Sequence, residues 1–433
     1  MRLAVAAVLV LLASVAARAA VLEKVAVEGD PAPDPGFSYH RKFGRPAVGD
    51  GPAARVASIV RIIPATGRNC IVAFDPGPGP DAIVACPKTA SPDGRQFTRL
   101  FDPTIAALGD TVFAAQVTFD RSGTYRSGGG IVDLTADPVP GGPGLLQDYR
   151  TAVVNDADGV VFAADISGGA VVGGVAVKRG LFRCSGGDGN CSTGTGTLET
   201  LVLLNDTVPD RPGRHLCTLD TYAASTYGVA FRAETQLDCA NHMEVPVAGD
   251  FRLAFGGAIE TLALEGEAAE PIPNPGGTTY GFIPGPPAIA NSGIVAFRAQ
   301  TSGILHNDVL YRCDPALCPA SRAAVAVKMG DLDDSGNAFQ LFSAPGVDDA
   351  GDVAFQARAG DRRRVSGVYL AHPNGDIETV ALLNDVAPGV TPAASFNFFG
   401  PPSMSPGGRV AFKAKVKAVV APRKTREGLF LRE

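Results

Sequence analysis

The sequence of 433 residues contains no tryptophan and has only four methionines and five histidines. The absence of tryptophan removes the residue that stacks best on sugar rings, although the eight tyrosines do not exclude a lectin. The Gly-x-Ser-x-Gly turn, which carries the nucleophile of α/β-hydrolases, does not occur. No two histidines are spaced as a metal-binding pair; they are His40, His215, His242, His306 and His372. The sequence therefore has no local motif for hydrolysis.

Long helices and long apolar runs are also missing after residue 20. No stretch of a dozen residues shows the i, i+3, i+4 pattern of an amphipathic helix. Short alternating segments rich in valine, phenylalanine and leucine take their place, and the 52 glycines and 34 prolines lie mainly between these segments. This pattern predicts an all-β protein.

One seven-residue phrase recurs along the chain. Gly351–Ala357 reads Gly-Asp-Val-Ala-Phe-Gln-Ala, and Gly293–Ala299 and Gly408–Ala414 repeat it closely. Its phenylalanine stands at positions 113, 162, 231, 297, 355 and 412, in steps of 49, 69, 66, 58 and 57 residues. A degenerate first copy lies at Arg55–Ile59. A period of this length indicates a repeat architecture.

Each phrase belongs to a longer unit of four short strands. An apolar strand with an acidic turn comes first (Glu378–Gly389), an aromatic segment follows (Phe396–Pro401), and another strand comes after the phrase (Gly428–Leu431). About seven such units predict a β-propeller of about seven four-stranded blades. The first element of a unit, Glu23–Pro31, stands near the start of the chain, so we expect the N- and C-terminal strands to close the ring. An open array, or a ring of six or eight blades, is the alternative.

Residues 1–20 resemble a secretory leader, with Arg2 before an apolar run and Ala17-Arg18-Ala19 as a cleavage site. The run is short for a membrane span, which needs about 20 apolar residues. We therefore expect an exported protein, periplasmic or extracellular, with a single propeller-like domain at residues 21–433 and no transmembrane segment in the mature chain.

The eight cysteines are an even number, as expected for disulfides in an exported chain. Cys184 and Cys313 directly follow equivalent strands, and Cys191 and Cys318 stand before the next strand of each unit. The four expected disulfides each lie within one unit: Cys70–Cys86, Cys184–Cys191, Cys217–Cys239 and Cys313–Cys318. Zinc is the alternative for the last pair, but no second pair of zinc ligands lies nearby.

The formal net charge is −6, and loss of Arg2 and Arg18 with the leader would make it −8. An acidic exported protein is not expected to bind nucleic acid, and we expect a monomer. The C-terminal end is basic, with Lys413, Lys415 and Lys417 alternating along one strand. We interpret these lysines as a solvated strand face; contact with an anionic glycan or a membrane surface is the alternative.

A turn carboxylate recurs in most units. These residues are Asp30, Asp137, Asp206, Asp331 and Asp385, with Glu267 in the corresponding stretch. In a closed ring they would form a circle of oxygen ligands that could hold a cation. An aspartate before a proline-containing turn also fixes the turn by accepting backbone hydrogen bonds, and recurrence in most blades favours this structural role.

One of these turns also resembles the first half of a calcium-binding loop. Asp331, Asp333 and Ser335 place oxygen atoms at loop positions 1, 3 and 5, and Gly336 stands at position 6. Position 12 is Phe342, where a calcium loop has a bidentate glutamate. Calcium is therefore the candidate cofactor, with Asp331, Asp333 and Ser335 as its candidate ligands.

The phrase and the polar residues before it, as in Asn291–Phe297 and Asp348–Phe355, resemble the NxxGxVAF tandem repeats of uncharacterised exported bacterial proteins. The turn at Leu383–Gly389 is similar to the Gly-Asp-x-Ala-Pro-Gly turn of that family. The resemblance is clearest from Leu201 onward and weak before Gly109. It implies a propeller-like repeat fold and export, and it brings no activity and no site residues. The cysteine-bearing loops depart from the family pattern.

Two functions are compatible with these observations. The first is an exported, non-catalytic propeller that acts as a binding or scaffold protein for a ligand or protein partner. The alternative is a secreted hydrolase or lyase that acts on a polysaccharide or a phosphoester at one face of the propeller. We prefer the first because no catalytic motif is present. His215 and His242 lie in the unit that departs most from the repeat, and they are the candidate ligand-binding residues.

Overall fold

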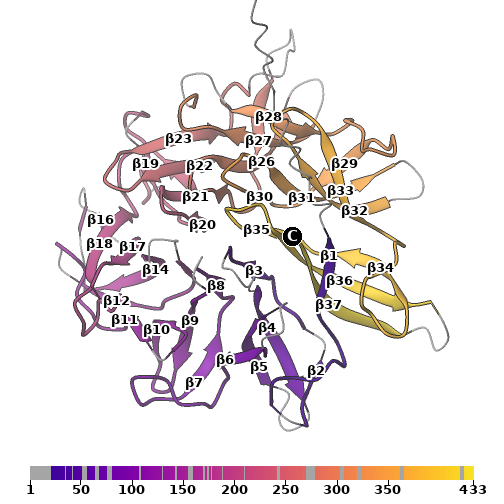
Figure 1. Ribbon diagram of the computed structural model, residues 1–433. Coiled ribbons are helices and arrows are strands. Elements are labelled where there is room, and N and C mark those ends of the chain that lie inside the picture. The colour runs from indigo at the N-terminus through magenta and orange to yellow at the C-terminus, as the bar shows by residue number, and fades with distance from the viewer. Residues whose placement is uncertain are drawn as a thin grey trace, which may run out of the picture.

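The computed structural model describes residues 21–433 except for short internal stretches, at 35, 41, 51–55, 64–67, 76–79, 107–108, 129, 142–143, 155–158, 169–170, 173–174, 177, 188, 209, 241–243, 270–277, 303–306, 319–322, 361–364 and 420–423. The expected leader, residues 1–20, lies outside the described residues. The described chain contains strands and no helix, and the strands form sheets arranged as a ring (Figure 1). Accordingly, none of the described residues belongs to a helix that could span a membrane.

The described strands form seven equivalent antiparallel sheets, the blades, and one small hairpin of β15 (Val171–Val172) and β16 (Val175–Ala176). We name the strand positions of a blade A to D in chain order, with A divided into A1 and A2. Position A1 comprises β2 (Ser38–His40), β7 (Phe97–Leu100), β12 (Leu145–Gln147), β19 (His215–Leu216), β24 (Thr279–Phe282), β29 (Phe339–Phe342) and β34 (Ala394–Phe399). Position A2 comprises β3 (Ala47–Val48), β8 (Thr104–Ile105), β13 (Ala152–Val154), β20 (Thr221–Ala224), β25 (Ala288–Ile289), β30 (Gly346–Val347) and β35 (Ser403–Met404). Position B comprises β4 (Val56–Ile63), β9 (Thr111–Val117), β14 (Val160–Ser167), β21 (Gly228–Gln236), β26 (Val295–Ser302), β31 (Val353–Ala359) and β36 (Val410–Ala418). Position C comprises β5 (Arg68–Phe74), β10 (Arg121–Arg126), β17 (Arg179–Ser185), β22 (Val247–Ala254), β27 (Asp308–Cys313), β32 (Val365–Ala371) and β37 (Thr425–Arg432). Position D comprises β6 (Ala82–Ala85), β11 (Gly130–Leu134), β18 (Thr197–Leu203), β23 (Ile259–Leu264), β28 (Ala324–Lys328), β33 (Ile377–Leu382) and β1 (Leu22–Val27).

The chain closes the ring by pairing its two ends. Within each blade the strand order is A–B–C–D, and A1 and A2 both pair with the same edge of B. The D strand of the last blade is β1, which runs antiparallel to β37 with Leu22 opposite Arg432 and Val27 opposite Gly428. Figure 1 shows the indigo β1 beside the yellow C-terminal strands. The predicted propeller of seven blades with paired terminal strands is therefore confirmed.

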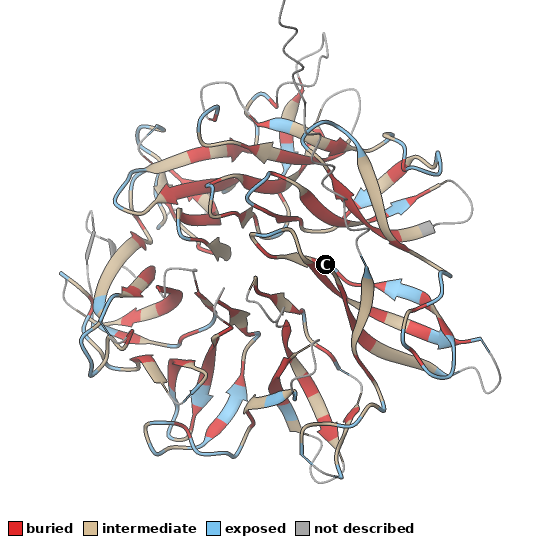
Figure 2. Ribbon diagram, in the orientation of Figure 1, coloured by how far each residue is buried: buried red, intermediate tan, exposed pale blue. Residues whose placement is uncertain are grey.

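The phenylalanine of the repeated phrase forms the core of each blade. In six blades it lies in strand B and stacks on an aromatic ring of strand C, with ring centroids 5.3–5.9 Å apart. The pairs are Phe113–Tyr125, Phe162–Phe182, Phe231–Phe251, Phe297–Tyr311, Phe355–Tyr369 and Phe412–Phe430. Figure 2 colours much of strands B and C as buried. In the first blade Ser58 lies opposite Val72 instead, which explains why the first copy of the phrase is degenerate.

The recurrent turn aspartates fix the end of strand D. Each carboxylate accepts a hydrogen bond from the backbone N–H three residues earlier, over 2.7–3.1 Å. The pairs are Asp30 with Val27, Asp137 with Leu134, Asp206 with Leu203, Asp331 with Lys328 and Asp385 with Leu382. The residue before the aspartate has a positive φ, 97° at Gly29 and 74° at Asn384, which favours glycine or asparagine at this position; Ala136, with a φ of 81°, is the exception among the five. These contacts agree with the expected structural role of the carboxylates, which is to fix the turn.

Candidate functional site

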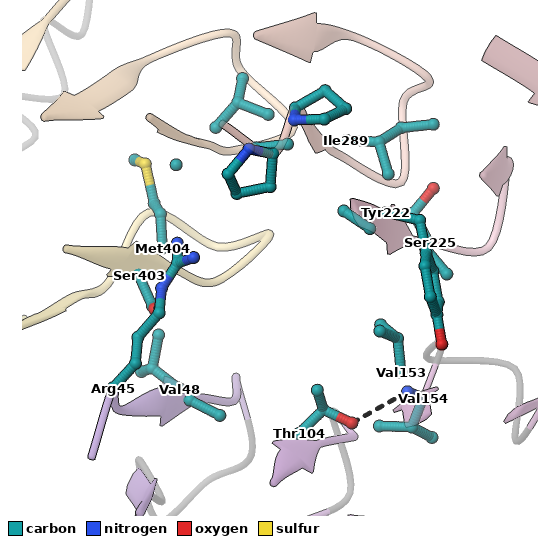
Figure 3. Close-up of a pocket in the computed structure, with 18 of the residues that line it drawn as sticks. Arg45, Val48, Thr104, Val153, Val154, Tyr222, Ser225, Ile289, Ser403 and Met404 are labelled. Carbon is teal, nitrogen blue, oxygen red and sulfur yellow. Dashed lines mark hydrogen bonds between the residues drawn. The ribbon is translucent and has the colours of Figure 1, made fainter. Parts of the chain in front are cut away.

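The seven A2 strands surround the axis of the ring. Each contacts the A2 strand of the next blade, in the order β3, β8, β13, β20, β25, β30, β35 and back to β3. They border a cavity of about 470 Å³, to which all seven blades contribute. Figure 3 shows Arg45 and Ser403 on one wall of this cavity and Tyr222 on another. We call this cavity the central channel.

Proline explains why strand A is divided into two parts. A proline directly precedes A2 in five blades; these residues are Pro46, Pro103, Pro287, Pro345 and Pro402. Proline has no N–H group to donate to the strand ladder, so pairing with strand B stops there and resumes with A2. The division was not predicted, because the expected unit had four undivided strands. The division could have been predicted from the proline that recurs before a small residue and an apolar residue.

Pairing with strand B gives the A2 segments a common register, so equivalent residues can be compared around the ring. One layer pairs with the alanine position of the phrase and consists of small or short side chains: Ala47, Thr104, Val153, Ala223, Ala288, Gly346 and Ser403. The layer two residues earlier consists of Arg45, Asp102, Thr151, Thr221, Pro286, Ala344 and Pro401. Side chains alternate along a strand, and the intervening residues such as Pro46 and Pro103 are buried. Twelve of the fourteen residues in the two layers line the channel, and Ala344 and Pro401 are the exceptions.

The small side chains let the A2 strands approach one another closely. A Cβ atom on Gly346 of β30 would lie only 2.8 Å from the Cβ atom of Met404 in β35. Contacts of that length do not occur between real side chains, so glycine is required at this point of the channel wall. The wall is built by close packing of neighbouring blades.

Arg45 and Asp102 are the only charged residues in the two channel-facing layers of the described chain. They occupy equivalent positions in adjacent blades. The Arg45 side chain donates from Nε to Ser403 Oγ and from Nη2 to the carbonyl oxygen of Pro402, both over 3.2 Å. Asp102 lies against Gly44, where an added Cβ atom would be 3.0 Å from Asp102 Oδ1. Blades one and two therefore differ from the other five, because only they place a charged side chain in these layers.

Desolvation by the channel walls shifts the pKa of both side chains. Both side chains are exposed to channel solvent, yet the surrounding walls replace much of the water around them. Desolvation lowers the pKa of Arg45, and the nearby charge of Asp102 opposes this shift only in part. Desolvation likewise raises the pKa of Asp102 against the opposing effect of Arg45. Asp220 also borders the channel, but its carboxylate is paired with the guanidinium of Arg232.

Polar side chains from the turns between A2 and B link neighbouring blades at the mouth of the channel. Asn291 accepts the backbone N–H of Thr226 from the preceding blade over 2.9 Å, and Asp349 accepts that of Ser292 over 2.9 Å. Asp50 accepts the N–H of Gly407 over 2.7 Å, which continues the pattern across the closure. A shallow pocket of about 370 Å³ lies among these turns. A polar residue in the turn between A2 and B therefore links adjacent blades at these three places.

The candidate calcium ligands lie away from the channel, in the turn between β28 and β29. Asp331 Oδ2 accepts the N–H of Lys328, and Asp333 Oδ1 accepts the N–H groups of Ser335 and Asn337 over 3.0 and 2.7 Å. Among the described residues, no group of three or more histidine, cysteine, aspartate or glutamate side chains is placed to hold a metal ion. The calcium site stays a prediction.

His215, one of the two candidate histidines, does not line the channel. His215 lies in β19, and its Nδ1 atom is 3.0 Å from the carbonyl oxygen of Asn205. His242 lies outside the described residues, so their joint role in ligand binding stays a prediction. His372 is held between Asp352, 3.0 Å from Nδ1, and Glu378, 3.7 Å from Nε2. No hydroxyl or thiol of the described chain bonds to the His372 ring, so a nucleophile–histidine pair is not formed there.

The structure contains four disulfides and no free cysteine among the described residues. They join the same pairs that the sequence analysis expects: Cys70–Cys86, Cys184–Cys191, Cys217–Cys239 and Cys313–Cys318. Each disulfide lies within one blade or its loops. Four disulfides are consistent with an oxidising environment and with export.

Comparison with known families matches residues 319–433 to a family described as "Family of unknown function (DUF7453)". The matched segment covers the last part of the fifth blade, the sixth blade and the seventh blade except for β1. No curated protein matches the chain.

Solved structures with a similar arrangement include the β-propeller domain of Cps50 (Swd1) from Myceliophteria thermophila, at 10% identity and a TM-score of 0.40, covering 90% of this chain and 98% of that domain. The polysaccharide lyase Uly1 aligns at 8% identity and a TM-score of 0.39, over 90% of each chain. A protein of unknown function from Dyadobacter fermentans DSM 18053 aligns at 10% identity and a TM-score of 0.36, over 95% of this chain and 99% of that one. At these levels the likeness concerns the fold alone.

Proposed function

We propose that this protein is an exported, non-catalytic binding protein, periplasmic or extracellular, whose ligand occupies the central channel. The proposal rests on a chemical difference between the blades. Five of the seven blades place neutral residues in both channel-facing layers, whereas blades one and two place Arg45 and Asp102 there. A residue that the fold requires would recur in each blade, whereas a residue that binds a single ligand need not recur.

The size and surface of the channel support this function. Ligand sites are usually concave cavities of roughly 300–1,000 Å³ with mostly apolar walls and a few polar groups. The channel, at about 470 Å³, falls in this range, and its small apolar residues include Val153, Ala223 and Ala288.

The experiment is a thermal-shift screen of small metabolites against the wild-type protein and a variant with a blocked channel. Ala288→Phe places a large side chain in the channel wall, and Leu341→Phe on an exposed A1 strand is the matched control. We expect compounds that raise the melting temperature of wild type and Leu341→Phe to leave Ala288→Phe unchanged. Compounds that stabilise all three proteins equally would place the binding site elsewhere and contradict the proposal.

A further inference from the structure

We propose that the ligand of the central channel is a small zwitterion of the amino acid class, with its carboxylate on Arg45, its ammonium group on Asp102 and its apolar remainder against the opposite wall. This inference rests on the channel-binding function proposed above. It specifies the chemistry of the ligand, which neither the fold nor the family match indicates.

Arg45 is oriented to bind a carboxylate. Two of its N–H groups are used by Ser403 Oγ and the carbonyl oxygen of Pro402, and these bonds hold the side chain on the channel wall. A guanidinium group has five N–H donors in a fixed plane, so donors remain for a ligand. Carboxylates match this planar arrangement through charge-assisted hydrogen bonds.

Asp102 supplies the opposite charge. No described residue donates a hydrogen bond to its carboxylate, and no described cation lies within 4.0 Å of it. Arg45 and Asp102 are therefore neighbours that do not form an ion pair with each other. Asp220, the other carboxylate at the channel, differs because Arg232 already neutralises it. The channel thus presents one cation and one anion side by side, each with unused bonding capacity.

A ligand with both charges fits this pair better than a ligand with one. A lone anion would neutralise Arg45 and repel Asp102, and a lone cation would do the reverse. The channel walls desolvate both groups, and this is why the pKa of Arg45 is lowered and that of Asp102 is raised. A zwitterion brings the missing opposite charge to each side chain at once.

The rest of the channel favours an apolar remainder of limited size. Across the ring from Arg45 and Asp102, the channel is lined by Pro286, Ala288 and Gly346, which have no polar side-chain atom. No charge in this part of the two layers would select a second ionic group. An amino acid with an apolar side chain complements both the charged side and the apolar side of the channel.

The test compares four probes by isothermal titration calorimetry: L-phenylalanine, 3-phenylpropanoate, 2-phenylethylamine and 2-phenylethanol. They share the aromatic ring and differ in carrying both charges, the carboxylate alone, the ammonium alone or neither. The proteins are wild type, Arg45→Gln, Asp102→Asn and the control Asp34→Asn, which removes an exposed carboxylate outside the channel. Circular dichroism and melting temperature establish that each variant is folded.

We expect L-phenylalanine to bind wild type and Asp34→Asn at least about tenfold more tightly than any other probe, since each charge-assisted hydrogen bond contributes that much or more. In Asp102→Asn, L-phenylalanine is expected to bind no more tightly than 3-phenylpropanoate. In Arg45→Gln it is expected to bind no more tightly than 2-phenylethylamine. This exchange of preference between the two variants is a result that a general loss of stability does not produce.

Two kinds of result would overturn the inference. Equal binding of L-phenylalanine and one singly charged probe to wild type would show that only one of the two side chains recognises a charge. Failure of all four probes to bind, while other compounds bind wild type and not Ala288→Phe, would reject the zwitterion and leave channel binding in place. Probe binding that survives in Ala288→Phe would instead reject the channel as the site, and with it the proposed function.

Discussion

Replacing Asp133 by asparagine is expected to change how the stability of the protein depends on pH. Asp133 lies in β11 of the second blade, fully buried. Its Oδ1 atom accepts the N–H of Leu134 over 2.9 Å, and its Oδ2 atom accepts no hydrogen bond from the described residues. Burial, followed by the neighbouring carboxylate of Asp137, raises the pKa of Asp133 to about 9.

The sign follows from where the proton is bound. Between the unfolded pKa of about 3.9 and the folded pKa of about 9, the folded protein keeps a proton on Asp133 that the unfolded chain has lost. The free energy of unfolding therefore falls as pH rises through this window, by about 1.4 kcal/mol per pH unit from this group alone. For a chain of roughly 410 residues after residue 20, an unfolding entropy of about 2.1 cal/mol/K per residue converts this slope to about 1.5 °C per pH unit.

The assay is differential scanning calorimetry of wild type and Asp133→Asn at pH 5, 6, 7 and 8, with the exposed Asp34→Asn as a control. Asparagine cannot ionise, so the difference in melting temperature between wild type and Asp133→Asn should fall by about 1.5 °C per pH unit. The difference between wild type and Asp34→Asn should stay nearly constant. Parallel curves for wild type and Asp133→Asn would refute the reasoning, because Asp133 would then hold the same number of protons folded and unfolded.

Three further substitutions test the contacts that hold the blades. Arg252→Met removes a fully buried guanidinium that bonds to Glu260, and we expect a loss of about 1.5–3 kcal/mol by calorimetry because the remaining Glu260 carboxylate is partly exposed, against little change for the exposed Arg358→Met. Phe412→Ala opens the stacked pair with Phe430 and should also cost about 3–5 kcal/mol, whereas the half-exposed Phe398→Ala should cost much less. Asp385→Ala removes the turn hydrogen bond and should cost about 1 kcal/mol, equally with calcium or with EDTA; a calcium-dependent loss would contradict the structural role of this carboxylate.

Much of the fold could be read from the sequence because its signals are local. The Val-Ala-Phe phrase marks strand B wherever a blade core needs an aromatic pair, and Phe355 with Tyr369 shows this pairing directly. The turn aspartates were visible because each acts on a backbone group only three residues away, as Asp206 does on Leu203. The first blade was hardest to recognise, since Ser58 replaces the phenylalanine there.

The candidate site could not be read in the same way. Arg45 and Asp102 belong to the two units in which the repeat is weakest, and no motif for a ligand surrounds either residue. Both stand before a proline, and the same proline recurs before short apolar pairs in later units, so an alignment on Pro46, Pro103 and Pro345 would have placed them in one layer. The sequence interpretation gave its attention to His215 and His242 instead, and these were singled out by their irregular unit rather than by a spatial argument.

The sequence by itself determined the strand pattern, the number of blades to within one, the pairing of the terminal strands and a set of cysteine pairs, because each depends on residues that are neighbours in the chain or equivalent in the repeat. Only the tertiary structure decided that strand A is divided and that seven short segments surround one channel. It alone placed Arg45 beside Asp102 without pairing them. Closure of the ring is the physical reason: it brings the A2 strands together through contacts between blades, and such contacts leave no periodic signal in any one segment of the chain.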